Sequence, residues 1–277
     1  MKLIKVADYN EMSRIAADYV IDKLHRNPQI KLGMATGDTP KGLYRELISD
    51  HVMNGTSYKH VQTFNLDEYI GLSGRDYQSY RYYMDTRLFD HIDIDKKNTH
   101  LPKGDAVDEF AEAEAYEKLI QDSGKVDLQI LGLGGNGHIG FNEPGTPFDS
   151  TTHVVELTLA TRTANAKFFG SLDLVPNRAI TMGISTIMGS EEILLLVSGA
   201  AKSTALSRLV LREIDEGFPA SILKTHQNAT IIADEAALQY LDSVVFGSVP
   251  AHDAIHGGRN ADIAGFWSLD VPVQDTI

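Results

Sequence analysis

The chain has 277 residues, with 25 Lys and Arg against 38 Asp and Glu, so its formal net charge is −13 when histidine is neutral. This acidic balance argues against a generic nucleic-acid-binding protein, because contacts with phosphate backbones need a basic face. A hydrophobic fraction of 43% and a charged fraction of 23% indicate a folded chain with a real core. The lack of cysteine excludes disulfides, thiolate metal ligands and thiol nucleophiles.

The N-terminal residues give no sign of a targeting segment. They read MKLIKVADYNEM and turn acidic before an apolar stretch of signal-peptide length develops. No run of about 18 apolar residues occurs further along, which is the length that a membrane-spanning helix needs. We therefore expect a cytoplasmic protein without membrane contacts.

Short apolar runs alternate with longer amphipathic segments, which is typical of parallel strands covered by helices. Asn10 is expected to cap the first helix, which Asn27-Pro28 would end, and Pro40 is expected at the first position of the second helix, which runs toward Ile48. Further helices are predicted over 77–91, 105–121 and 163–169, from 199–202 onward, and over 235–241. Strands are predicted over 3–6, 30–35, 61–66, 126–133, 154–157, 179–182, 192–197 and 229–233.

This order of elements predicts an α/β fold, with a doubly wound, mostly parallel sheet flanked by helices. Residues 1–243 are expected to form a single domain. Residues 244–277 are rich in Gly, Asp, Pro and His and show little periodicity, so they are predicted to be a C-terminal appendage. Phe246, Phe266 and Trp267 are the side chains through which it could pack on the core.

Residues 132–137 match the G-x-G-x-x-G pattern of dinucleotide-binding proteins, with Glu156 about 20 residues further on. In that class the third glycine begins a helix whose N-terminus faces the pyrophosphate. Here Pro144 and Pro147 follow instead and forbid an immediate long helix. The pattern therefore indicates a long functional loop rather than a nucleotide site, and no G-x-x-x-x-G-K-[ST] phosphate loop occurs.

Three segments place polar residues at the ends of predicted strands, where open α/β sheets form their ligand crevice. The first contains Thr36, Gly37, Asp38 and Thr39, whose backbone N–H groups could bind a phosphate, or could form an ordinary helix cap. The second contains Asp67 and Glu68, although two adjacent acids at a strand end more often form a solvated turn. We expect the three segments to converge in space.

The third segment holds His138, Asn142 and Glu143 in a glycine-rich loop. The glycines would let a substrate approach closely, and the carboxylate of Glu143 could fix the tautomer of His138, although a lone histidine is more often structural. A metal site is not expected, because His138 and Glu143 lack the helical spacing of zinc ligands and no third ligand is evident.

Three stretches, taken together, resemble the glucosamine-6-phosphate deaminase family: FNLDEY at 64–69, GGNGHIGFNEP at 134–144 and TRTANAKFF at 161–169. The resemblance extends from the first strand to about Leu241. It implies a modified Rossmann-like fold, shared with 6-phosphogluconolactonases. It also implies conversion of D-glucosamine 6-phosphate and water to D-fructose 6-phosphate and ammonia, without an organic cofactor.

The resemblance also implies roles for single residues. Asp67 matches the general base that takes the C2 proton of the opened sugar, and His138 matches the residue that helps to open the pyranose ring. Glu143 would orient and tune that imidazole. Asn136 stands where enterobacterial members carry an aspartate in the same histidine network, so the pH profile is expected to differ.

Phosphate recognition is implied for the 36–39 loop together with Lys202 and Lys167, the latter on a segment that resembles the family's mobile lid. Lys167 replaces an arginine, which exchanges a bidentate fork for a point charge. Asp38 stands where glycine or serine is common and would repel a phosphate unless it points away. Tyr80 matches a tyrosine of the family's tyrosine-rich segment, although it could serve packing alone.

Two other functions stay open. A lactonase of the same superfamily is disfavoured, because residues 141–144 read FNEP and lactonases have a different sequence at these positions. A silent sugar-phosphate sensor is disfavoured by the joint presence of Asp67, His138 and Glu143.

His153 and Val155 replace basic residues of the allosteric members, which favours a monomer or small homo-oligomer. The sequence leaves open whether the preferred amino sugar is the gluco or the galacto epimer.

Overall fold

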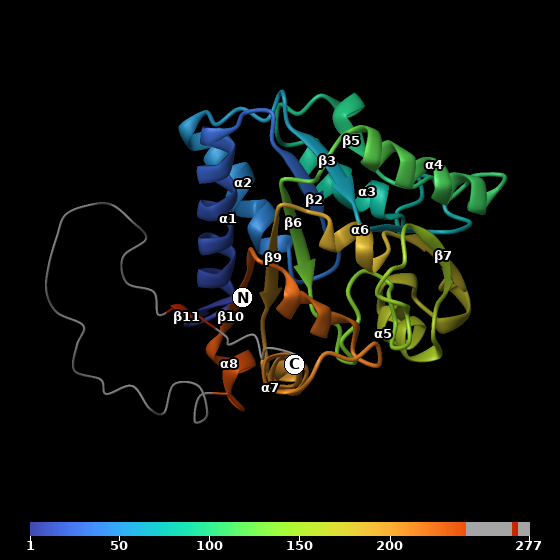
Figure 1. Ribbon diagram of the computed structural model, residues 1–277. Coiled ribbons are helices and arrows are strands. Elements are labelled where there is room, and N and C mark those ends of the chain that lie inside the picture. Colours follow the sequence, from blue (N-terminus) through green and yellow to red (C-terminus); the bar gives the residue numbers. More distant parts are fainter. Residues whose placement is uncertain (242–267, 271–277) are drawn as a thin grey trace, which may run out of the picture.

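The main sheet of the computed structural model, which describes residues 1–241 and 268–270, has the strand order β11-β1-β10-β9-β6-β2-β3-β5 (Figure 1). All neighbouring pairs are parallel except β11 with β1. The prediction of a mostly parallel α/β sheet is therefore confirmed. The strands are β1 (Lys2–Val6), β2 (Lys31–Met34), β3 (Gln62–Asn65), β5 (Thr99–His100), β6 (Leu128–Gly132), β9 (Glu192–Val197), β10 (Ala229–Asp234) and β11 (Ser268–Asp270).

A second, antiparallel sheet has the order β4-β8-β7, with β4 over Asp67–Tyr69, β8 over Arg178–Thr181 and β7 over His153–Glu156. Leu66 joins the two sheets, because its N–H donates to Met34 and its carbonyl accepts from Met182. The sequence predicted Asp67 at the end of the preceding strand. Instead it begins a new strand opposite Thr181, since the chain changes partners at Leu66.

Helices cover the sheets on several sides (Figure 1). Helices α1 and α2 pack against each other beside the main sheet, and α4 lies against β7 and β8 of the small sheet. The central strands are nearly all buried, and β10 is buried over its whole length. The helices are α1 (Tyr9–Arg26), α2 (Lys41–Asn54), α3 (Tyr80–Met84), α4 (Glu109–Asp122), α5 (Leu159–Phe169), α6 (Ile184–Met188), α7 (Ser203–Leu211) and α8 (Glu235–Leu238).

Several predicted boundaries differ from the structure. Asp8, not Asn10, caps α1, and its carboxylate accepts from the N–H groups of Asn10 and Glu11. Pro40 is itself the capping residue of α2, with no side-chain cap. The tyrosine-rich helix is shorter than predicted: α3 begins after Ser79 and continues into a π-helical turn over Asp85–Phe89. The last predicted helix is also shorter, since α8 ends at Leu238.

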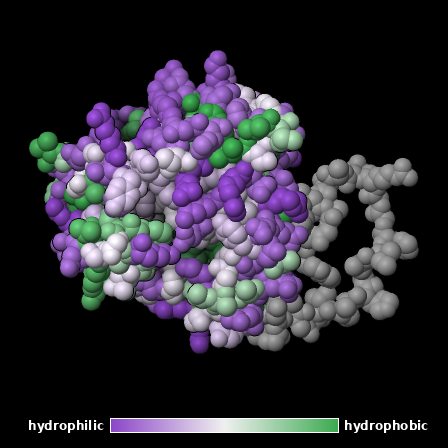
Figure 2. Space-filling view, turned by 180° about the vertical axis from the view of Figure 1, so that it is seen from behind, coloured by the Kyte–Doolittle hydropathy of each residue, from purple (hydrophilic) through white to green (hydrophobic). Residues whose placement is uncertain are grey.

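The C-terminal part of the chain adds one strand that the sequence did not reveal. Strand β11 pairs antiparallel with β1 at the edge of the main sheet. The predicted packing through Phe246, Phe266 and Trp267 lies outside the described residues, and the domain boundary at residue 243 stays a prediction. In the described part of the chain, no helix is both long and apolar enough to cross a membrane. The face shown in Figure 2 is mostly hydrophilic, with hydrophobic side chains in small separate groups.

Candidate active site

The three predicted segments meet at one cavity of about 410 Å³, located beyond the carboxyl ends of β2, β3 and β6. Parallel strands bring their carboxyl ends to the same sheet edge, which is why segments distant in sequence converge here. Asn136 and Glu143 do not line this cavity and lie behind His138. The predicted residues that line it are Thr36, Gly37, Asp38, Thr39, Asp67, Tyr80, His138, Lys167 and Lys202.

Asp67 presents a buried carboxyl group to the cavity, with only 6% of the residue exposed. Burial, and secondarily the charge of Glu68, raises its pKa to about 8. A carboxyl group with such a pKa is a stronger base than an ordinary aspartate once it loses its proton. Asp67 therefore has the environment of a general base that works near neutral to mildly alkaline pH.

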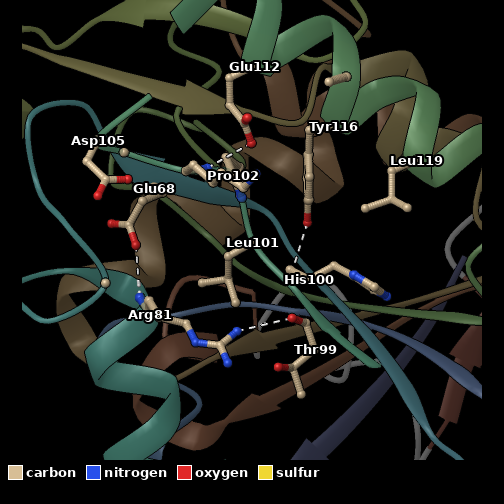
Figure 3. A pocket seen from close by; sticks show the side chains of 14 residues that line it. Glu68, Arg81, Thr99, His100, Leu101, Pro102, Asp105, Glu112, Tyr116 and Leu119 are labelled. Atoms are coloured by element: carbon tan, nitrogen blue, oxygen red, sulfur yellow. Dashed lines mark hydrogen bonds between the residues drawn. The ribbon is translucent and has the colours of Figure 1, made fainter. Parts of the chain in front are cut away.

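Glu68 points into a different space from Asp67, as expected for neighbours on a strand. Its carboxylate accepts from the backbone N–H groups of Tyr69, Tyr80 and Arg81, and burial raises its pKa to about 7. It lines a separate cavity of about 500 Å³ between α3, β5 and α4, where Arg81 also donates to the carbonyl of Thr99 (Figure 3). Glu68 thus fixes the start of α3, which carries Tyr80 into the active-site cavity.

The ring of His138 is oriented by Asn136. Nδ2 of Asn136 donates to the carboxylate of Glu143 at 2.6 Å, so its Oδ1 faces Nδ1 of His138 at 2.8 Å. A carboxylate can only accept hydrogen bonds when ionised, which fixes this order of donors and acceptors. Nδ1 of His138 therefore carries the proton, and Nε2 keeps its lone pair for a ligand.

Glu143 acts on His138 through this amide. Its nearer oxygen lies 3.9 Å from Nδ1 of His138, beyond hydrogen-bond distance. Burial lowers the pKa of His138, the charge of Glu143 opposes this shift, and Lys202 adds to it. The imidazole is thus neutral near pH 7, which suits a proton acceptor.

Thr161 belongs to the same hydrogen-bonded network, which the sequence did not reveal. Its hydroxyl donates to Oε1 of Glu143, and Thr158 donates to the same oxygen at 3.3 Å. Both threonines stand at the start of α5, 15 to 18 residues after Glu143. Thr161 precedes the helix predicted over 163–169, and nothing in its local sequence indicates a contact with Glu143, so only the fold could show it.

Gly134 lets the ring of His138 sit against the backbone. A Cβ atom added at Gly134 would lie 2.4 Å from the imidazole, which no packing tolerates, whereas one added at Gly135 would meet nothing within 4 Å. Gly134 is therefore required for the close approach of the His138 ring. A dinucleotide site would require a helix directly after this loop, but the next regular element of the chain is strand β7.

Three tyrosine hydroxyls hold the carbonyl groups of the 36–39 loop and the residue before it. Tyr44 donates to Ala35, Tyr83 donates to Gly37 at 2.7 Å, and Tyr9 donates to Asp38 at 3.0 Å. In the described residues the N–H groups of Thr36, Gly37, Asp38 and Thr39 have no protein partner. These donors, next to the N-terminus of the 14-residue helix α2, can bind an anion.

The cations of the cavity come from two elements. Lys202 is partly buried, its pKa is lowered by burial and by Lys167, and its Nζ donates to the carbonyl of Leu133 at 2.7 Å. Lys167, on α5, pairs with Asp38 at 2.8 Å. Asp38 pairs also with Lys41 at 2.6 Å, so it is held by lysines and does not cap α2 as its position suggested.

The chain matches the model of the family of glucosamine-6-phosphate isomerases and 6-phosphogluconolactonase over residues 7–232. Because this match spans most of the chain, the protein belongs to that family. Within this family, the glucosamine-6-phosphate deaminase of Shouchella clausii is 56% identical over 237 residues, which cover 86% of this chain and 96% of the relative. Glucosamine-6-phosphate deaminase 1 of Bacillus subtilis is 48% identical over 237 residues, covering 86% and 98%.

Solved structures agree with the family assignment. A monomeric glucosamine-6-phosphate deaminase superposes with a TM-score of 0.85 at 48% identity, covering 86% of this chain and 99% of the other. The 6-phosphogluconolactonase of Trypanosoma brucei superposes with a TM-score of 0.70 at 17% identity, covering 86% and 98%. At that identity the second likeness shows the fold alone.

Proposed function

We propose that this chain is a glucosamine-6-phosphate deaminase, which converts D-glucosamine 6-phosphate and water to D-fructose 6-phosphate and ammonia. The observation that carries the proposal is that Asp67 and His138 line the same cavity as the anion-binding loop and two lysines. Relatives at 46 to 56% identity bear this activity in their names. The cavity therefore combines two acid-base groups with a place for a phosphate.

His138 begins the reaction by opening the sugar ring. Nε2 accepts the proton of the C1 hydroxyl and returns it to the ring oxygen as the bond between C1 and that oxygen breaks, which gives the acyclic aldehyde. The aldehyde makes the C2 proton acidic, so ring opening must precede proton abstraction. The Asn136 contact keeps the proton on Nδ1, which leaves Nε2 ready for this step.

Asp67 then moves a proton from C2 to C1. Its carboxylate removes the C2 proton to give an enol-amine, and the resulting carboxylic acid protonates C1, which leaves an iminium at C2. Water adds to C2, and the C–N bond breaks to release ammonia and the C2 ketone. The raised pKa of Asp67 suits both proton transfers, because the group must first accept the proton from C2 and then donate it to C1.

The backbone N–H groups of the 36–39 loop, with Lys202 and Lys167, would hold the phosphate at the other end of the sugar. These local cations oppose the repulsion that a chain of net charge −13 exerts on an anionic substrate. For the oligomeric state and location we propose a cytoplasmic monomer or small homo-oligomer, in line with the monomeric relative of known structure.

An assay of the purified chain tests the reaction. Ammonia and fructose 6-phosphate should form in equal amounts from glucosamine 6-phosphate, with galactosamine 6-phosphate run in parallel to settle the epimer. 6-Phosphogluconolactone should not be hydrolysed above its spontaneous rate. Lactone hydrolysis without ammonia would establish a lactonase, and binding of fructose 6-phosphate in calorimetry without any turnover would establish a sensor.

Replacing Thr161 by valine should lower kcat about tenfold and change KM less than twofold. The variant keeps the shape of the side chain but removes the donor to Glu143, so Glu143 and Asn136 no longer fix the tautomer of His138. Thr161→Ser should restore most of kcat because it keeps the hydroxyl. Thr163→Val changes an exposed threonine of the same helix and serves as the control. Equal rates for the two valine variants would contradict the role of Thr161.

A further inference from the structure

A second cavity of about 480 Å³ lies beside the catalytic cavity, and Asp38 and Thr39 line both. Its remaining walls come from four elements that the proposed reaction does not use. They are the start of α1 at Tyr9, the exposed side of α2, the π-helical turn after α3, and Ser198 at the end of β9. This space is distinct from the one that holds Asp67 and His138.

The charge of this second cavity is strongly positive, although the chain as a whole is acidic. Lys41, Arg45 and Arg87 line it, against the single carboxylate of Asp38. Lys41 and Arg45 are four residues apart on α2 and so share one face of that helix. Within the part of the chain that the structure describes, five other arginines form ion pairs with carboxylates: Arg14, Arg26, Arg81, Arg178 and Arg208.

Arg45 and Arg87 differ from those paired arginines. Within residues 1–241 and 268–270, neither guanidinium makes a hydrogen bond to a protein group or an ion pair. The chain has 38 acidic against 25 basic residues, so partners for an arginine are plentiful. Two unpaired guanidinium groups that face one cavity, next to a lysine, are therefore arranged for a ligand that is itself anionic.

We propose that this second cavity binds a phosphate group. Two arginine forks and one ammonium group match the charge and the three terminal oxygens of a phosphate dianion, whereas a single carboxylate would leave excess positive charge. A nucleic acid does not fit, because the rest of the chain would repel an extended polyanion. The source of the phosphate is either free inorganic phosphate or a second molecule of a sugar phosphate.

Asp38 links the two phosphate sites. Its Oδ1 accepts from Lys41, which faces the second cavity, and its Oδ2 accepts from Lys167, which faces the catalytic cavity. If phosphates occupy both sites, both lysines turn to them and the carboxylate of Asp38 is left between two anions. The two sites are therefore antagonistic, and by linkage each weakens the other by the same factor.

Isothermal titration calorimetry with inorganic phosphate at low salt tests the site without requiring turnover, so its result is independent of the proposed reaction. The wild-type chain should bind two phosphates, and the double variant R45Q/R87Q should bind one. Arg75→Gln, which changes an exposed arginine outside both cavities, should still bind two. Equal melting temperatures verify that the variants fold. Equal numbers of bound phosphates in the wild type and in R45Q/R87Q would overturn the proposal.

Steady-state kinetics test the antagonism, and this arm rests on the proposed reaction. The apparent KM of the wild type should rise steeply at low phosphate and less steeply at high phosphate, because occupation of the second cavity weakens substrate binding only until that cavity is full. It should rise linearly in R45Q/R87Q and in Asp38→Asn, and a linear rise in the wild type would disprove the coupling. Negative cooperativity in the substrate saturation curve that R45Q/R87Q removes would identify the sugar phosphate as the ligand, and a hyperbolic curve in the wild type would identify free phosphate.

Discussion

Replacing Asp67 by asparagine is expected to lower kcat about a thousandfold, which is the range that loss of a general base produces. The amide has the shape of the carboxyl group but cannot accept the C2 proton, so substrate should still bind with a similar Kd. Ammonia release in single turnover and fructose 6-phosphate binding by calorimetry measure the two quantities. Asp149→Asn, at an exposed position outside the cavity, is the control. A variant that kept full activity would refute the assigned role.

The same substitution should make the chain more stable. Burial raises the folded-state pKa of Asp67 from 3.8 to about 8, so between these pH values the folded chain binds more protons than the unfolded chain. Stability from this group is therefore lost as the pH rises across that window. Asp67→Asn removes the cost of burying an ionised carboxylate. It should raise the free energy of unfolding by about 1–2 kcal/mol at pH 8 and by less at pH 5. Urea unfolding at the two pH values checks this, and an equal gain at both would contradict the raised pKa.

Replacing Gly134 by alanine is expected to lower kcat about a hundredfold, because the new methyl group would stand 2.4 Å from the ring of His138. KM should change little, since the 36–39 loop is untouched. Gly135→Ala makes the same chemical change one residue later, where the methyl group meets no atom within 4 Å, and its loss should be far smaller.

A double-mutant cycle shows whether Gly134 acts through His138. His138→Gln should itself reduce kcat strongly, and adding Gly134→Ala to it should cost little more, because the ring that collides is no longer there. Additive losses in the double variant would mean that the alanine disturbs the loop in another way.

Much of the fold follows from local patterns. The apolar run at Glu192–Val197 was predicted with the bounds that β9 has, because a buried parallel strand bounded by turn residues is a strong signal. The convergence of the Thr36, Asp67 and His138 segments was also predictable, since the carboxyl ends of parallel strands share one edge. Asp8 was a missed local signal, because Glu11 stands three residues after it, as in a capping box.

Other features depend on contacts between distant residues and leave no local trace. Strand β4 forms because Asp67 pairs with Thr181 on β8, and strand β11 forms because it pairs with β1. The contact between Thr161 and Glu143, and the ion pair between Lys167 and Asp38, arise only when α5 is placed over the cavity. A sequence shows which residues can react, but such partners are chosen by the tertiary fold.

The tyrosine hydroxyls that tether the carbonyl groups of Ala35, Gly37 and Asp38 have a consequence for selectivity. A loop that is held in its binding conformation before any ligand arrives loses little entropy on binding. The 36–39 loop should therefore bind every phosphomonoester about equally well. Discrimination among hexose phosphates must then come from the far end of the molecule, where an amine at C2 and an openable ring meet the acid-base pair. Phosphorylated metabolites that lack those groups would occupy the pocket without reacting and slow the enzyme in proportion to their abundance.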